Sequence, residues 1–198
     1  MKNVSSVFVL LLVASLWGLV EVLPLSTFLY CAAGVLFLTL GRRLVPLAGS
    51  ALLIGLVVCA FKTLNSSFMV CQWTGVMSIA VGFEAATLLF RNTLRDSVYR
   101  DMIVGAATCL IALPVFIGWI VGIAEHPYWI EGGWERIGAY ALQTSAVAAA
   151  LSLITAPAGR FLAEALQTRT APVHRPAFAL GSVIIIVCWI IAVYPKLS

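Results

Sequence analysis

The sequence predicts an all-α protein that crosses a membrane several times. Hydrophobic residues make up 62% of the 198-residue chain and charged residues only 10%, and the mean hydropathy is +1.06. The apolar residues form long runs that are separated by short charged clusters, which leaves too little polar surface for a soluble domain. Because lipid satisfies no backbone polar group, these runs are expected to be helices.

Seven runs are candidate membrane spans, since roughly 20 mostly apolar residues are needed to cross about 30 Å of hydrocarbon. They cover residues 5–23, 25–41, 47–62, 68–90, 102–124, 137–157 and 177–194. The first follows Lys2 as a signal peptide would, but no small-residue cleavage site follows it, so we expect a retained helix. The third is short, and with the fourth it is expected to form a tight hairpin around "TLNSS".

These runs predict two units along the chain. Residues 1–168 are expected to form a six-helix transmembrane bundle, and residues 169–198 a linker followed by an additional, seventh transmembrane helix. Arginines follow the second, fourth and sixth runs, and such basic connections stay in the cytoplasm. We therefore expect a protein of the cell membrane with a cytoplasmic amino terminus and an external carboxyl terminus. The net charge of +4 comes from these arginines and does not indicate nucleic acid.

The connection after the fifth run, "EHPYWIEGGWER", is acidic and aromatic and is expected on the external side. Two interpretations of its Tyr128, Trp129 and Trp134 stay open. They anchor the chain at the membrane interface, or they form the lid of an external ligand pocket.

Glu21 is a carboxylate inside the first apolar run. A charge facing lipid is costly, so intramembrane charges usually face a bundle interior or a cavity. Helical spacing puts Ala14, Trp17 and Gly18 on the same face. The small residues Ala14 and Gly18 let another helix approach closely, so we predict that this face contacts a partner helix.

Lys62, at the outer end of the third run, is the expected partner of Glu21. Either the two charges form an ion pair that fixes the register of two helices, or they line an outward-facing site for a polar solute. Amide side chains inside a helix bundle also need hydrogen-bond partners, and Gln72 and Gln143 lie in the fourth and sixth runs. We predict a small-molecule pocket bounded by Glu21, Lys62, Gln72, Trp73 and Gln143.

Glu84 lies in the fourth run, toward its cytoplasmic end. It either caps a helix contact or contributes to a proton path. Proton transport is disfavoured because a relay needs a chain of ionisable groups, and too much depth separates Glu84 from Glu21.

No sequence motif indicates catalysis. Walker, nucleophile-elbow and HExxH motifs are lacking, as is a glycine-rich phosphate loop. The five cysteines form no CxxC pair. We therefore expect no catalytic residue, no metal, no cofactor and no ATP hydrolysis by the chain itself.

The stretch "SLWGLVEVL", followed by "GRRLVPLAGSALLIGLVVCAFK", resembles the S components of energy-coupling factor transporters, which are their substrate-binding membrane subunits. The resemblance covers roughly residues 13–90 and rests on Trp17, Gly18, Glu21, the Gly41-Arg42-Arg43 turn, Gly49, Gly55 and Lys62. It implies six helices, an external solute pocket, and a separate coupling subunit with paired ATPases. It further implies that Ala14 and Gly18 contact the coupling subunit. The seventh run and Pro24 depart from the family pattern.

The leading expectation is thus a solute-binding subunit of an energy-coupling factor-type importer for a small polar molecule. The alternative is a non-catalytic structural subunit of a larger respiratory, photosynthetic or oxygenase complex. In that case Glu21 and Lys62 fix helix register, and the seventh helix docks the protein to its neighbours.

Overall fold

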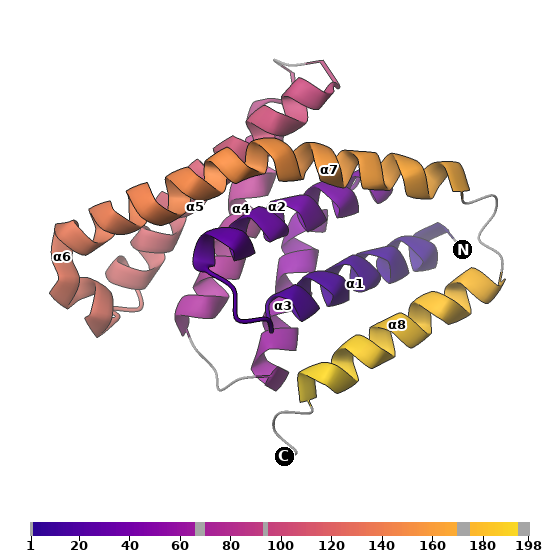
Figure 1. The fold of residues 1–198 in the computed structure, drawn as a ribbon, viewed down its shortest axis with the longest axis horizontal. Coiled ribbons are helices and arrows are strands. Elements are labelled where there is room, and N and C mark those ends of the chain that lie inside the picture. Colours follow the sequence, from indigo (N-terminus) through magenta and orange to yellow (C-terminus); the bar gives the residue numbers. More distant parts are fainter. Residues whose placement is uncertain (1, 66–69, 93–94, 170–174, 194–198) are drawn as a thin grey trace.

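The computed structural model describes residues 2–65, 70–92, 95–169 and 175–193, and every regular element in these ranges is helical. The elements in chain order (Figure 1) are α1 (Lys2–Val20), α2 (Thr27–Leu44), α3 (Ser50–Asn65), α4 (Val70–Leu89), α5 (Val98–Gly122), α6 (Pro127–Tyr140), the π-helix η1 (Ala141–Ala146), α7 (Val147–Arg169) and α8 (Arg175–Val193). The all-α prediction is confirmed, and each of the seven apolar runs contains a helix.

Several helices have the length and composition of membrane spans. The stretches long and apolar enough to cross a bilayer are Thr27–Leu44, Val98–Gly122 and Pro127–Gln167. Shorter apolar helices are Ser6–Val20, Ser50–Leu64 and Ala179–Val193. This character fits a protein that associates with a membrane.

The extent of the sixth run was predicted wrongly. The sequence predicts a helix over 137–157, whereas the helical path begins at Pro127 in α6 and continues through η1 to Arg169 in α7. Pro127 lies in the first turn of α6, where its missing N–H is not needed. Gly133, with φ of 55°, introduces a kink in α6. Charged residues interrupt the apolar run here, so hydropathy alone does not reveal the helix.

The helices pack into one bundle. α4 lies along α5, and α7 packs against α2 and α5 (Figure 1). Fully buried side chains of α1, α2 and α3 include Trp17, Leu38 and Ile54. At Gly105 of α5, a Cβ atom would lie 2.7 Å from the backbone oxygen of Ser152 in α7. The two backbones therefore approach so closely that only glycine fits at this position.

The last helix packs on the rest of the bundle. α8 lies beside α1 in Figure 1 and contacts both α1 and α3. The Trp189 indole donates a hydrogen bond to Ser15 Oγ at 3.0 Å. Its ring meets Phe61 of α3 edge-on, with 5.5 Å between the ring centroids. The unit expected over residues 169–198 thus contributes its helix to the same packed body.

An ion-pair network joins several helices at the end of the bundle that carries the arginines. The Arg43 guanidinium of α2 donates to Asp96 at 2.6 and 2.9 Å and to Asp101 at 2.8 and 2.9 Å. Arg160 of α7 reaches the same carboxylates at 3.2 and 3.3 Å. Arg43 and Asp96 are 53 residues apart, so the sequence shows the arginines but not their partners.

This network predicts an acid-sensitive part of the stability. The hydrogen bond from Arg43 lowers the pKa of the Asp96 carboxyl from 3.8 to about 2. Because the folded-state pKa lies below the unfolded one, the pair stabilises the fold above about pH 4, and this contribution is lost as the pH falls toward 2. We expect a shallow decline of the melting temperature in this window, since the Asp96 side chain is 55% exposed. Asp96→Asn should flatten the decline, and parallel curves for the two proteins would contradict the assignment.

Candidate functional site

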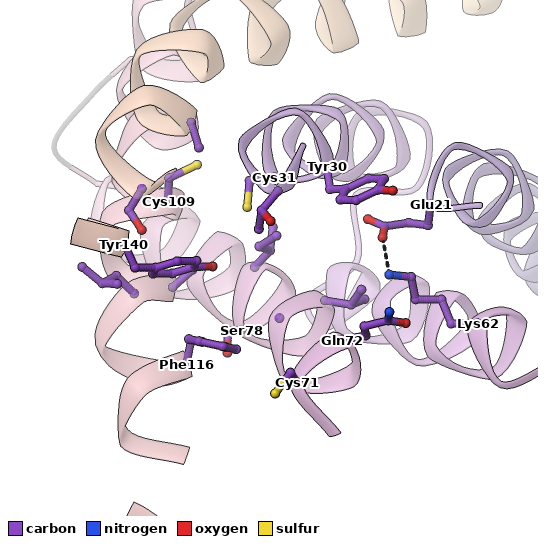
Figure 2. A pocket seen from close by; sticks show the side chains of 18 of the residues that line it. Glu21, Tyr30, Cys31, Lys62, Cys71, Gln72, Ser78, Cys109, Phe116 and Tyr140 are labelled. Carbon is purple, nitrogen blue, oxygen red and sulfur yellow. Dashed lines mark ion pairs between the residues drawn. The ribbon is translucent and has the colours of Figure 1, made fainter. Parts of the chain in front are cut away.

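A partly open cavity of about 300 Å³ lies among α1 to α7. We call it the Glu21 cavity. Its lining residues include Glu21, Thr27, Tyr30, Cys31, Lys62, Cys71, Gln72, Ser78, Cys109, Phe116, Trp129, Tyr140 and Ser145. Figure 2 shows Glu21, Lys62 and Gln72 at one end of the cavity and Phe116 and Tyr140 at the other. One end is therefore charged and polar, and the opposite end is aromatic.

The charged end is built on the ion pair that the sequence predicts. Lys62 Nζ lies 2.6 Å from Glu21 Oε2, and the dashed line in Figure 2 marks this contact. The Trp17 indole donates to Glu21 Oε1 at 3.1 Å. The two residues are only 7% and 9% exposed. The pairing of Glu21 with Lys62 is confirmed, and both partners line the cavity.

Tyr30 completes this end and was not identified from the sequence. Lys62 Nζ lies 5.3 Å from the centroid of the Tyr30 ring, within reach of a cation–π contact. The Tyr30 hydroxyl donates to the Leu23 carbonyl and accepts from the Leu25 N–H at 3.1 Å. Tyr30 therefore also fixes the turn around Pro24 that joins α1 to α2. Its position in the first turn of an apolar helix gave no signal of either role.

Three rings form the aromatic end: those of Phe116 and Trp129 are buried, and that of Tyr140 is half-buried. Trp129 meets Phe116 and Tyr140 edge-on at 5.3 and 5.1 Å between centroids, and Phe116 stacks on Tyr140 at 5.5 Å. Trp129 is 7% exposed, whereas Trp134 is 84% and Tyr128 56% exposed. Trp129 therefore lines the cavity, which is compatible with the lid interpretation. The two outward-facing aromatic side chains suit the anchor interpretation.

The π-helix η1 explains why Gln143 is not part of the cavity. Gln143 is exposed, whereas Ser145, two residues later in η1, is buried and lines the cavity. A π-helix turn changes which residues face inward, and such turns occur frequently at functional sites. The prediction of Gln143 as a lining residue was wrong, because this amide is exposed and Ser145 takes the inward position in η1.

Trp73 also lies outside the lining, although its neighbour Gln72 lines the cavity as predicted. The Trp73 side chain packs against the hydrophobic core. Consecutive helical residues point in directions about 100° apart, so these two side chains do not face the same space. Of the five predicted pocket residues, the structure brings Glu21, Lys62 and Gln72 together.

The small-residue face of α1 is occupied within the chain. Ala14 and Trp17 are fully buried. A Cβ at Gly18 would lie 2.7 Å from the Phe61 ring of α3, and one at Gly34 of α2 would lie 2.7 Å from the Trp17 ring. The expected close helix approach is present, but its partners are α2 and α3. The assignment of this face to a separate coupling subunit is therefore corrected.

Glu84 serves as a helix cap at the opposite end of the bundle. Its Oε1 accepts the Ala51 N–H in the first turn of α3 at 3.1 Å and lies 3.6 Å from Arg42 Nη1. A carboxylate is favourable at a helix amino terminus, where N–H groups are unpaired. The capping interpretation of Glu84 accounts for its position.

Three thiols also line the cavity, those of Cys31, Cys71 and Cys109. Cys109 Sγ lies 3.3 Å from the Ser152 hydroxyl. Within the described ranges, no three His, Cys, Asp or Glu side chains form a group that could hold a metal ion. Cys109 is buried, and Cys31 and Cys71 are half-buried. The three cysteines are small apolar side chains of the cavity wall.

The arrangement suits reversible binding of a small molecule that has a charged end and an apolar or aromatic part. The ion pair offers one charge of each sign, Gln72 offers an amide, and the three rings offer flat apolar surface. Comparisons with known protein families, with curated proteins and with solved structures find no match to this chain.

Proposed function

We propose that the protein is a membrane-embedded subunit that binds a small polar solute for an energy-coupling factor-type importer. The observation that carries this proposal is the Glu21 cavity, in which a buried ion pair faces an aromatic wall. Its volume of about 300 Å³ is at the lower end of the range for small-molecule pockets, about 300–1,000 Å³. A compact solute is therefore expected.

A zwitterionic solute fits the charged end best. Its cationic group would face Glu21 and its anionic group Lys62, so each buried charge would exchange one partner for another. Leaving a buried charge without a partner is strongly destabilising, which disfavours solutes with a single charge. The apolar part of the solute would contact Phe116, Trp129 and Tyr140.

In this proposal the Glu21 cavity opens on the external side and the arginine-rich end faces the cytoplasm. The amino terminus is then cytoplasmic, and the carboxyl terminus, after α8, is external. A transmembrane coupling subunit and ATPases supply the energy, since the sequence carries no ATPase motif. Because Ala14 and Gly18 are buried inside the bundle, the coupling subunit must contact other surfaces.

The alternative is a non-catalytic structural subunit of a larger membrane complex. One observation favours this alternative: the Glu21 carboxylate already has two partners within the chain, Lys62 and Trp17, and so needs no ligand. In this alternative the pair fixes the register of α1 and α3, and the apolar face of α8 docks on a neighbouring subunit.

Solute binding can be tested with a matched pair of amide variants. The purified protein is screened by thermal shift against small zwitterions, such as amino acids and betaines. We expect at least one to raise the melting temperature. Gln72→Ala, inside the cavity, and Glu21→Gln should weaken its binding by roughly tenfold. Gln143→Ala, which removes an exposed amide outside the cavity, should leave the affinity unchanged.

Two results would contradict the solute-binding proposal. One is equal affinity in the Gln72→Ala and Gln143→Ala proteins. The other is co-purification from native membranes, in fixed stoichiometry, with redox or oxygenase subunits in place of a coupling subunit and ATPases. That second result would support the structural alternative.

A further inference from the structure

A second cavity, of about 480 Å³, lies at the opposite end of the bundle from the Glu21 cavity, between α2, α4 and α5. We call it the arginine cavity. Its charged lining residues are Arg42, Arg43, Arg91, Arg100, Asp96 and Asp101. Four guanidinium groups and two carboxylates leave the lining with an excess of two positive charges.

Two of these four arginines are already held by carboxylates, and two are not. Arg43 is bonded to both aspartates, and Arg42 lies 3.6 Å from Glu84. Among the described residues, Arg91 and Arg100 form no ion pair within 4.0 Å, although both line the cavity. Arg91 is exposed and Arg100 half-buried. Two cations that make no direct ion pair among the described residues therefore line the same space.

Thr87 gives an independent indication of a ligand. This residue lines the arginine cavity and is only 9% exposed, yet its hydroxyl has no hydrogen-bond partner in the described part of the chain. Thr39, Thr74 and Thr108 in these helices each donate to the carbonyl four residues earlier, whereas the Thr155 hydroxyl of α7, away from the cavity, likewise has no partner among the described residues. A buried polar group without a partner is rare and points to an unseen one.

We propose that the arginine cavity binds a phosphate group. The planar guanidinium donates two parallel hydrogen bonds to phosphate oxygens, and such charge-assisted bonds are the strong ones. Arg91 and Arg100 neutralise the charge of the group, and the Thr87 hydroxyl donates to a remaining oxygen. The phosphate is carried by a soluble ester or by the headgroup of an anionic lipid. This site is separate from the Glu21 cavity and does not depend on the proposed function.

The test uses the full-length protein purified in an uncharged detergent. In one arm, inorganic phosphate and glycerol phosphate are titrated at constant ionic strength, and the melting temperature is followed. In the other arm, native mass spectrometry measures retention of phosphatidylglycerol against phosphatidylcholine. Stabilisation by the soluble compounds identifies a soluble ester as the source. Selective retention of phosphatidylglycerol without such stabilisation identifies a lipid headgroup.

Three variants distinguish phosphate binding in the arginine cavity from nonspecific attraction of an anion to any basic side chain. Arg91→Gln combined with Arg100→Gln should weaken binding by roughly tenfold or more. Arg95→Gln removes an exposed arginine of the same connection that does not line the cavity, and it should bind as the unmodified protein does. Thr87→Val keeps every charge and should weaken binding several-fold, which provides a readout if the double variant does not fold.

Absence of binding in both arms would overturn the proposal. So would the same loss in Arg95→Gln as in the double variant, because that result would mean that net charge alone attracts the anion.

Discussion

Lys62→Met is expected to lower the free energy of unfolding by about 3–5 kcal/mol, because it leaves the Glu21 carboxylate buried without its cation. Glu21 is 7% exposed, and its only other bond is donated by the Trp17 indole at 3.1 Å among the described residues. Methionine keeps the length and apolar packing of the lysine stem, so the loss reports the missing charge. Denaturant unfolding in detergent micelles, followed by tryptophan fluorescence, measures the effect.

The double variant Glu21→Gln with Lys62→Met is the matched control. It removes both charges, and the glutamine side-chain oxygen can still accept the Trp17 hydrogen bond. Its stability should therefore return close to that of the unmodified protein, since replacing a complete buried pair is often neutral. If the single and double variants lose the same stability, the loss is due to packing at position 62 and our account of the pair is wrong.

The same two proteins distinguish a binding role of the pair from a structural one. A solute that binds through both charges should fail to bind to either variant, although only Lys62→Met is strongly destabilised. If the double variant is stable and still binds solute, then Glu21 and Lys62 serve only to fix helix register.

Gly105→Leu is the second change with a large expected effect, and it should prevent α5 and α7 from packing. A Cβ at this position would lie 2.7 Å from the Ser152 backbone oxygen and 2.7 Å from the Ala156 Cβ. Overpacking typically costs about 1–3 kcal/mol and occasionally more. We expect the upper part of this range or beyond, because a backbone oxygen cannot rotate away as a side chain can. Size-exclusion chromatography and thermal unfolding measure the loss of folded protein.

Gly118→Leu provides the control in the same helix. No atom lies within 4 Å of a Cβ built at Gly118, so leucine fits there. Replacing a helical glycine should stabilise the helix slightly, by up to about 1 kcal/mol. Equal destabilisation by the two substitutions would mean that α5 does not tolerate leucine for reasons unrelated to the contact with α7.

The apolar runs predicted where the helices lie. An apolar run can be read directly along the chain, and in a protein of this composition each such run is expected to form a helix. The Glu21–Lys62 pair could also be predicted, since a charge within an apolar run requires a partner and few candidates exist. Side-chain direction was predicted less well. Gln143 and Trp73 face away from the cavity because the π-helix and core packing set their directions, and neither leaves a signal in composition.

Most of the features that the sequence did not predict are contacts between residues far apart in the chain. The partners of Arg43 lie 53 and 58 residues away, and nothing local marks Asp96 or Asp101 as their acceptors. The partners of Ala14 and Gly18 could not be assigned either. A small-residue face indicates close packing, but it does not indicate whether the neighbouring helix belongs to the same chain.

The π-helix η1 has a geometric consequence for how the aromatic end of the Glu21 cavity is attached to the bundle. A π turn contains one more residue than an α turn, so removing one residue from Ala141–Ala146 restores a regular α-helix. The segment before the deletion would then rotate by about 100° relative to α7. Tyr140 and Trp129 would swing out of the cavity wall, while the contacts of α7 with α2 and α5 stay in place. The aromatic wall of the cavity thus depends on the one extra residue in the π turn. A change of chain length at this point would alter which molecules fit in the cavity, while the packing of α7 on α2 and α5 is kept.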